Sequence, residues 1–130
     1  MAEPRARVFE YQADFDGGVR VTAKGESVDL PDSWQPEELV LAAVVDCSLT
    51  SLRYHAKREG IEVKATGHAS GTVTRHPEHG RFAFVDIEVR LNVTLTPPPA
   101  DQAALLAKAE RDCFIGASLT AKPLYVWNVE

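Results

Sequence analysis

The residues of this sequence best suited to chemistry are its two cysteines, Cys47 and Cys113. Cys47 lies in the segment "AAVVDCSLTSLRYHAKREG". A thiol that reduces peroxides needs a thiolate form, a cation that stabilises it, and a second thiol that resolves the oxidised product. The sequence supplies two thiols but no obvious local cation. The competing interpretation is an inert pair, because free cysteine is among the most buried residue types.

Composition and charge narrow the classes of function. The 130 residues carry a net charge of −5, which argues against a surface that neutralises nucleic acid phosphates. The longest apolar run, residues 39–45, is far too short to span a bilayer. The N-terminal segment "MAEPRARVFEYQ" lacks the apolar region of a secretory signal. We therefore expect a cytoplasmic protein that binds neither nucleic acid nor membrane, with free or redox-active cysteines.

One long helix is predicted to position Cys47. The segment "DSWQPEELVLAA" begins it, with Pro36 suited to the first turn, and Gly60 ends it, so we expect a helix over residues 36–58. Between residues 39 and 52 the only charged side chain is Asp46. A helix that is apolar all round is a buried helix, so this one is expected to be covered by a sheet or a partner.

Alternating apolar residues predict strands on both sides of this helix. In "ARVFEYQAD", Phe9, Tyr11 and Ala13 share one face, and the following Gly-Gly turn predicts a hairpin. "SVDL" is predicted as a short third strand. After the helix, "IEVKAT" and "GHASGTVTRH" indicate strand and "HPEHG" a turn, and "RFAFVDIEVRLNVTLT" is the clearest strand of the chain.

A second helix is predicted to position Cys113. In "ADQAALLAKAERDC" the residues Leu105, Ala109 and Cys113 repeat every four positions, which puts the thiol on the apolar face. "PLYVWNVE" is predicted as the closing strand. The order of elements indicates an α+β protein with one domain over residues 1–130. A chain of this length buries a small core, which makes a dimer plausible.

The motifs around both cysteines resemble a known family. "PEELVLAAVVDC" is similar to the signature that precedes the first cysteine of the OsmC/Ohr proteins (osmotically inducible protein C-like, organic hydroperoxide resistance), and "AERDCFIGASL" is similar to the helix of their second cysteine. The resemblance implies a β-hairpin and strands packed around a long central helix in an intertwined homodimer. It also implies a thiol-dependent peroxidase without a cofactor. Cys47 would attack the peroxide, Cys113 would resolve the product, and an external dithiol, in some members a lipoylated protein, would reduce the disulfide.

The resemblance assigns two further site residues. Glu37 matches the glutamate of the family motif, and Arg20 is the nearest match to the arginine that this glutamate holds. The alternative for Arg20 is a solvent-facing arginine on its strand, because Val19 and Val21 would face the core. Glu37 and Cys47 lie about 15 Å apart along one helix, so Glu37 is expected to act through Arg20 or from the partner chain.

Two departures from the family pattern keep a second function open. Asp46 precedes Cys47 where the family has a small neutral residue, and a nearby carboxylate raises the pKa of a thiol. Residues 114–117 differ from the segment that follows the family's second cysteine. The alternative function is a non-catalytic dimer that binds a small hydrophobic ligand or senses oxidants stoichiometrically. His76 and His79 in "RHPEHG" are interpreted as part of a polar turn rather than a metal site.

Overall fold

The computed structural model describes residues 6–130, which fall into two compact units, one up to Gln35 and the other over Pro36–Glu130. The mixture of a long helix and sheets confirms the predicted α+β class. Within residues 6–130, no helix combines the length and apolar character needed to cross a membrane. The single domain over 1–130 and the intertwined homodimer stay predictions.

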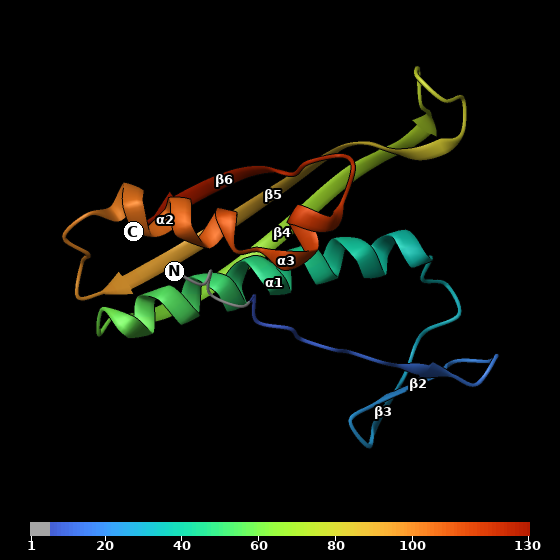
Figure 1. Cartoon of the computed structure of the whole chain (residues 1–130), viewed down its shortest axis with the longest axis horizontal. Coiled ribbons are helices and arrows are strands. Elements are labelled where there is room, and N and C mark those ends of the chain that lie inside the picture. Colours follow the sequence, from blue (N-terminus) through green and yellow to red (C-terminus); the bar gives the residue numbers. More distant parts are fainter. Residues whose placement is uncertain (1–5) are drawn as a thin grey trace, which may run out of the picture. The chain divides into compact units, whose positions relative to one another are not determined.

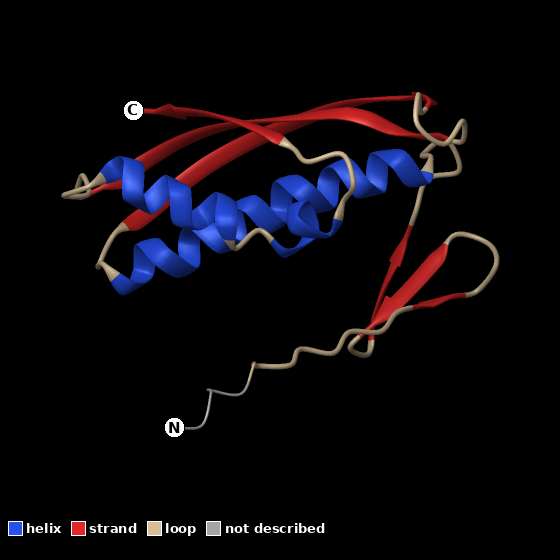
Figure 2. Ribbon diagram, turned by 45° about the horizontal axis from the view of Figure 1, so that its top comes forward, coloured by secondary structure: helices blue, strands red, loops and turns tan. Residues whose placement is uncertain are grey.

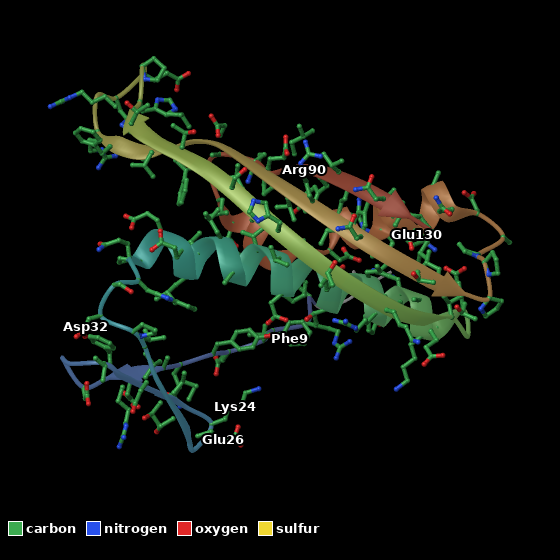
Figure 3. The ribbon with its side chains drawn as sticks, turned by 180° about the vertical axis from the view of Figure 1, so that it is seen from behind. Phe9, Lys24, Glu26, Asp32, Arg90 and Glu130 are labelled. Atoms are coloured by element: carbon green, nitrogen blue, oxygen red, sulfur yellow. The ribbon has the colours of Figure 1, made fainter. Side chains whose placement is uncertain are left out.

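The first unit contains a small antiparallel sheet. Its strands β1 (Asp14–Phe15), β2 (Arg20–Ala23) and β3 (Glu26–Asp29) lie in the order β1-β2-β3. Between β2 and β3, Lys24 and Gly25 have φ angles of 54° and 77°, the positive values that a two-residue hairpin turn requires. Figure 3 shows Lys24 and Glu26 at this turn. The predicted hairpin at the Gly-Gly turn is confirmed by the antiparallel pairing of β1 with β2, and the predicted third strand is confirmed by β3.

The predicted strand in "ARVFEYQAD" is wrong for most of its length. Only Asp14 and Phe15 pair with β2, and the preceding residues are irregular. Val8 and Tyr11 are well exposed, so the alternation seen in the sequence marks no buried face within this unit. Strand pairing, which a short alternating pattern cannot specify by itself, decides where β1 begins.

The second unit begins with α1 (Pro36–Arg58), whose bounds agree with the prediction. Glu37 and Glu38 lie in its first turn, where acidic side chains complement the helix dipole. Gly60, with a φ of 72°, ends the helix in the left-handed conformation that favours glycine. Val44 and Leu52 are completely buried, whereas Ala42, Asp46 and Thr50 are exposed, so within this unit α1 is a core helix on one side and not all round as its composition predicted.

The sheet of the second unit has three strands, β4 (Glu62–Arg75), β5 (Phe82–Thr96) and β6 (Leu124–Val129). β4 and β5 form a long antiparallel hairpin, and β6 runs parallel to β5 on its other side. Alternate apolar residues of β5 are buried, as predicted: Ile87, Val89, Leu91, Val93 and Leu95. Figures 1 and 2 show the helices of this unit on one face of the sheet. That face and α1 enclose the core.

The second predicted helix ends earlier than expected. Of the segment predicted as helix, residues 100–113, α2 covers Gln102–Arg111, and Cys113 instead caps the N-terminus of a separate short helix, α3 (Phe114–Ser118). Asp112 leaves helical geometry because its carboxylate is bound by His55 of α1, and aspartate is a weak helix former. Cys113 is nevertheless completely buried, like Leu105 on α2.

Candidate functional site: a thiol pair between α1 and α3

The two free thiols lie together inside the second unit. Cys47 comes from the middle of α1 and Cys113 from the junction of α2 and α3. The Ile115 amide of α3 contacts Cys47 Sγ, and Cys113 caps the N-terminus of the same helix, so α3 brings both thiols to one site. Cys47 is partly exposed, whereas Cys113 is completely buried. Two thiols at one site, one of them accessible, can carry out thiol–disulfide chemistry without a large rearrangement of the fold.

Backbone amides of α3 contact the Cys47 sulfur. The Ile115 N–H donates a hydrogen bond to Cys47 Sγ at 3.5 Å. Burial raises the pKa of the Cys47 thiol above its ordinary value, and its electrostatic and hydrogen-bond interactions with Cys113 raise it further. The amides of Ile115 and Phe114 oppose this increase in pKa because they stabilise the thiolate. The balance leaves Cys47 predominantly protonated at neutral pH within this unit.

The Ser48 hydroxyl contacts Cys113, and its other hydrogen bond sets the direction of this contact. The Ser48 hydroxyl donates to the Val44 carbonyl at 2.7 Å, which uses its single proton. In its contact with Cys113 Sγ at 3.5 Å, Ser48 therefore accepts, and Cys113 S–H donates. Ser48 is itself buried, so this contact ties the buried thiol directly to α1.

Tyr125 of β6 completes the surroundings of Cys113. A methyl group added at Gly116 would lie 2.2 Å from Tyr125 Oη and 3.2 Å from Cys113 Sγ, so both atoms lie close to the bare backbone of α3. Burial, and then hydrogen-bond and electrostatic interactions with Cys113, raise the pKa of the Tyr125 phenol well above its usual range. Tyr125 therefore stays protonated and can donate beside the thiol.

Side-chain contacts of Asp112 anchor the turn that carries Cys113. His55 Nε2 and Asp112 Oδ2 are 2.7 Å apart, and the Arg111 guanidinium contacts the same carboxylate at 2.9 and 3.0 Å. Hydrogen bonding to Arg111, and secondarily to His55, lowers the pKa of Asp112 to about 2. The carboxylate next to Cys113 is thus charged at neutral pH and ties the turn to α1.

Of the two other predicted site residues, Glu37 lies in the second unit with the thiols and Arg20 lies in the first unit. Glu37 is in the first turn of α1. Arg20 is on β2, where its Nε donates to Asp29 Oδ1 at 3.0 Å and its side chain is 58% exposed. Within its own sheet Arg20 is therefore paired across the strands. The roles of Arg20 and Glu37 at the thiol site stay predictions.

Asp46 lines a groove of about 490 Å³ between α1 and β4. The groove residues are Glu38, Leu41, Ala42, Val45, Asp46, Leu49, Gly67, His68 and Ala69. From the sequence, the Asp46 carboxylate is expected to raise the pKa of the neighbouring Cys47 thiol. The raised pKa of Cys47 comes first from burial, and the interactions with Cys113 add to it.

The histidine pair in "RHPEHG" shapes its turn. His76 and His79 stack with their ring centres 4.4 Å apart, and their Nδ1 atoms accept N–H donors from Glu78 and Arg81. No cluster of three or more metal-ligating side chains occurs among the residues that the structure describes. These contacts give both imidazoles a structural part in the turn.

Sequence reasoning did not identify Ser48, Gly116 and Tyr125 as part of the site. Tyr125 lies in the segment predicted as the closing strand, and that pattern gives no indication of which helix the strand meets. Ser48 directly follows Cys47 and is a polar residue within a mostly apolar helix, and this was the one feature of the sequence that could have identified it as a site residue. Gly116 in "CFIGAS" gives no indication, from one sequence, that it makes room for a side chain of another element.

Comparisons with known proteins agree with this geometry. The family model described as OsmC-like protein matches residues 29–126. An OsmC-like protein from Mycoplasma pneumoniae has a similar structure, with a TM-score of 0.70 at 13% identity, covering 94% of this chain and 96% of that chain. An organic hydroperoxide resistance protein OsmC from Legionella pneumophila gives 0.58 at 20% identity, covering 98% and 99%. OhrB of Bacillus subtilis, an organic hydroperoxide resistance protein, gives 0.55 at 19%, covering 93% and 96%. No functionally curated protein matches the chain.

Proposed function

Because the chain belongs to the OsmC-like family, we propose that it is a thiol-dependent peroxidase that reduces organic hydroperoxides. The observation that carries the proposal is the meeting of two free thiols, from α1 and the α2–α3 junction, at one site. The names of similar structures from Legionella pneumophila and Bacillus subtilis, which include organic hydroperoxide resistance, support the same substrate class.

Cys47 carries out the first step. Its thiolate attacks the terminal oxygen of the hydroperoxide, an S–O bond forms, and the O–O bond breaks. The alkoxide takes up a proton and leaves as an alcohol, while Cys47 becomes a sulfenic acid. The amides of Ile115 and Phe114 support the thiolate before attack. In the proposed homodimer, Arg20 and Glu37 supply the remaining charge that activates Cys47.

Cys113 carries out the second step. Its sulfur attacks the sulfur of the Cys47 sulfenic acid, the S–S bond forms, the S–O bond breaks, and water leaves. An external dithiol then reduces the disulfide and is itself oxidised to a disulfide. A lipoylated protein is one suitable dithiol. Hydrogen peroxide would follow the same steps, with water in place of the alcohol.

A second function is favoured by the raised pKa of Cys47. A thiol that is mostly protonated reacts slowly, so the pair would serve as a stoichiometric redox sensor rather than a catalyst. The partly apolar groove between α1 and β4 also leaves room for a small hydrophobic ligand. Turnover separates these functions from a peroxidase, because a sensor consumes one oxidant per thiol pair.

The test is sustained consumption of cumene hydroperoxide by reduced protein with excess dithiothreitol. A peroxidase consumes many equivalents, and Cys47→Ser abolishes this consumption while the protein stays folded by circular dichroism. Ser51→Ala on the same helix is a matched control that leaves both thiols in place. Consumption that stops at about one equivalent per chain would contradict the peroxidase and favour the sensor.

A further inference from the structure

Tyr125 lies beside the thiol pair and takes no part in the two steps described above. Its hydroxyl lies over Gly116, next to Cys113 Sγ, and any side chain at position 116 would collide with it. The strand that carries Tyr125 follows α3 in sequence and pairs with β5, which fixes the ring against the core. The pairing of β6 with β5 therefore positions the Tyr125 ring, and glycine at position 116 of α3 leaves room for its hydroxyl.

The second step of the proposed reaction needs a proton transfer at this place. Cys113 must lose its S–H proton in order to attack, and the hydroxide that leaves Cys47 must gain one. Ser48 cannot supply it, because its proton is donated to the Val44 carbonyl. His55 is engaged with Asp112. Within the second unit, the Tyr125 hydroxyl is the protonated group that faces Cys113 and is not committed to a backbone acceptor.

We propose that Tyr125 is a catalytic residue of the resolving step, in which its phenol relays a proton from Cys113 to the leaving oxygen of Cys47. The phenol gives its proton to the departing hydroxide, which leaves as water, and takes the proton of Cys113 as the S–S bond forms. Sulfur–oxygen and sulfur–hydrogen bonds break, sulfur–sulfur and oxygen–hydrogen bonds form, and Tyr125 ends in its starting state. The relay needs no further oxidant or reductant. It rests on the proposed peroxidase function.

Two features of the site agree with a relay. The phenol stays neutral at physiological pH because burial and Cys113 disfavour its anion, so it always has a proton to give. The Tyr125 hydroxyl and Cys113 Sγ both lie over Gly116, and the amide of the preceding residue, Ile115, contacts Cys47 Sγ at 3.5 Å, so both sulfurs lie against the stretch of α3 that Tyr125 covers. General acid–base groups in such positions contribute about 100-fold or more to a rate.

The experiment separates the two steps with one equivalent of cumene hydroperoxide added to reduced protein. Samples quenched over time are treated with dimedone, which traps sulfenic acid, and with a thiol alkylating reagent, and are then analysed by mass spectrometry. Tyr125→Phe removes only the hydroxyl. We expect it to slow disulfide formation at least about tenfold and to accumulate sulfenic acid on Cys47, at a rate of first-step oxidation close to that of the wild type. Tyr54→Phe, an exposed tyrosine on α1, is the matched control.

The outcomes distinguish the relay from the peroxidase proposal. Disulfide formation by Tyr125→Phe at the wild-type rate would overturn the relay and leave the peroxidase intact. Absence of both sulfenic acid and disulfide in the wild type would overturn the peroxidase, and the relay with it. Gly116→Ala, which keeps the phenol but displaces its oxygen, provides a second variant if Tyr125→Phe does not fold. It should accumulate the same sulfenic acid, and rapid resolution in this variant would count against the relay.

Discussion

Alanine at position 116 would place a methyl group 2.2 Å from Tyr125 Oη, where ordinary contacts begin at 3.4 Å. The substitution favours the helix by about 1 kcal/mol, because alanine is a better helix former than glycine. Overpacking costs about 1–3 kcal/mol, because the rigid phenol ring has to move. We expect Gly116→Ala to lower the free energy of unfolding by about 1 kcal/mol, taking the middle of the two ranges.

The same substitution should cost less when Tyr125 has no hydroxyl. In Tyr125→Phe the colliding oxygen is gone, so alanine at 116 should be neutral or stabilising. The two changes should therefore couple by about 1–2 kcal/mol in a double-mutant cycle. Urea unfolding of the reduced protein, followed by circular dichroism at one fixed protein concentration, gives the four free energies. A cycle of Gly116→Ala with Tyr54→Phe should be additive.

Additivity of the Gly116 and Tyr125 changes within about 0.5 kcal/mol would refute this packing. It would mean that Tyr125 Oη does not lie over Gly116, and the hydroxyl would then have no defined position beside Cys113. This result would remove the geometric basis of the proton relay. It requires no peroxide, so it tests the packing separately from the proposed function.

Three further predictions concern groups close to the thiols. Because the pKa of Asp112 is lowered in the folded protein, its carboxylate stabilises the fold above pH 3.8, and this stability is lost as the pH falls toward 2. The loss is at most about 1 kcal/mol, because the carboxylate is partly exposed. Asp112→Asn should remove this part of the acid sensitivity, measured by urea unfolding at a series of pH values. The Ser51 hydroxyl is buried without a hydrogen bond, so Ser51→Ala should raise the free energy of unfolding by about 1 kcal/mol, whereas Ser48→Ala, which removes a bonded hydroxyl, should lower it. Equal effects of the two serine changes would contradict this difference. Cys113→Ala should lower the pKa of Cys47, measured as the pH midpoint of iodoacetamide alkylation, because Cys113 raises it; an unchanged midpoint would show that the thiols do not interact.

Much of the fold was predictable because its elements have strong internal periodicity. The nearly uncharged stretch of α1 and the alternation along β5 each indicate one type of structure, and both were confirmed. The N-terminal segment was less predictable, because its alternation is short and only Asp14 and Phe15 find a strand to pair with. The end of α2 depends on a contact between Asp112 and His55 of another helix, which no pattern within the segment indicates.

Of the residues at the thiol site, only the two cysteines were predictable from the sequence. Cys47 and Cys113 were paired because the motifs around both resemble one family, and in the structure both residues lie against the N-terminal turn of α3. Tyr125 and Gly116 could not be identified, because their relation to Cys113 exists only after β6 and α3 have packed together. A tertiary contact of this kind has no signal in the spacing of residues along the chain.

The central claim is that Cys47 and Cys113 form one reactive pair. The most direct measurement adds one equivalent of cumene hydroperoxide to the reduced protein and maps its cysteines by peptide mass spectrometry. We expect a disulfide between Cys47 and Cys113 of the same chain, and in Cys113→Ser a sulfenic acid that stays on Cys47. Cysteines that remain reduced, or disulfides formed only between chains, would contradict it.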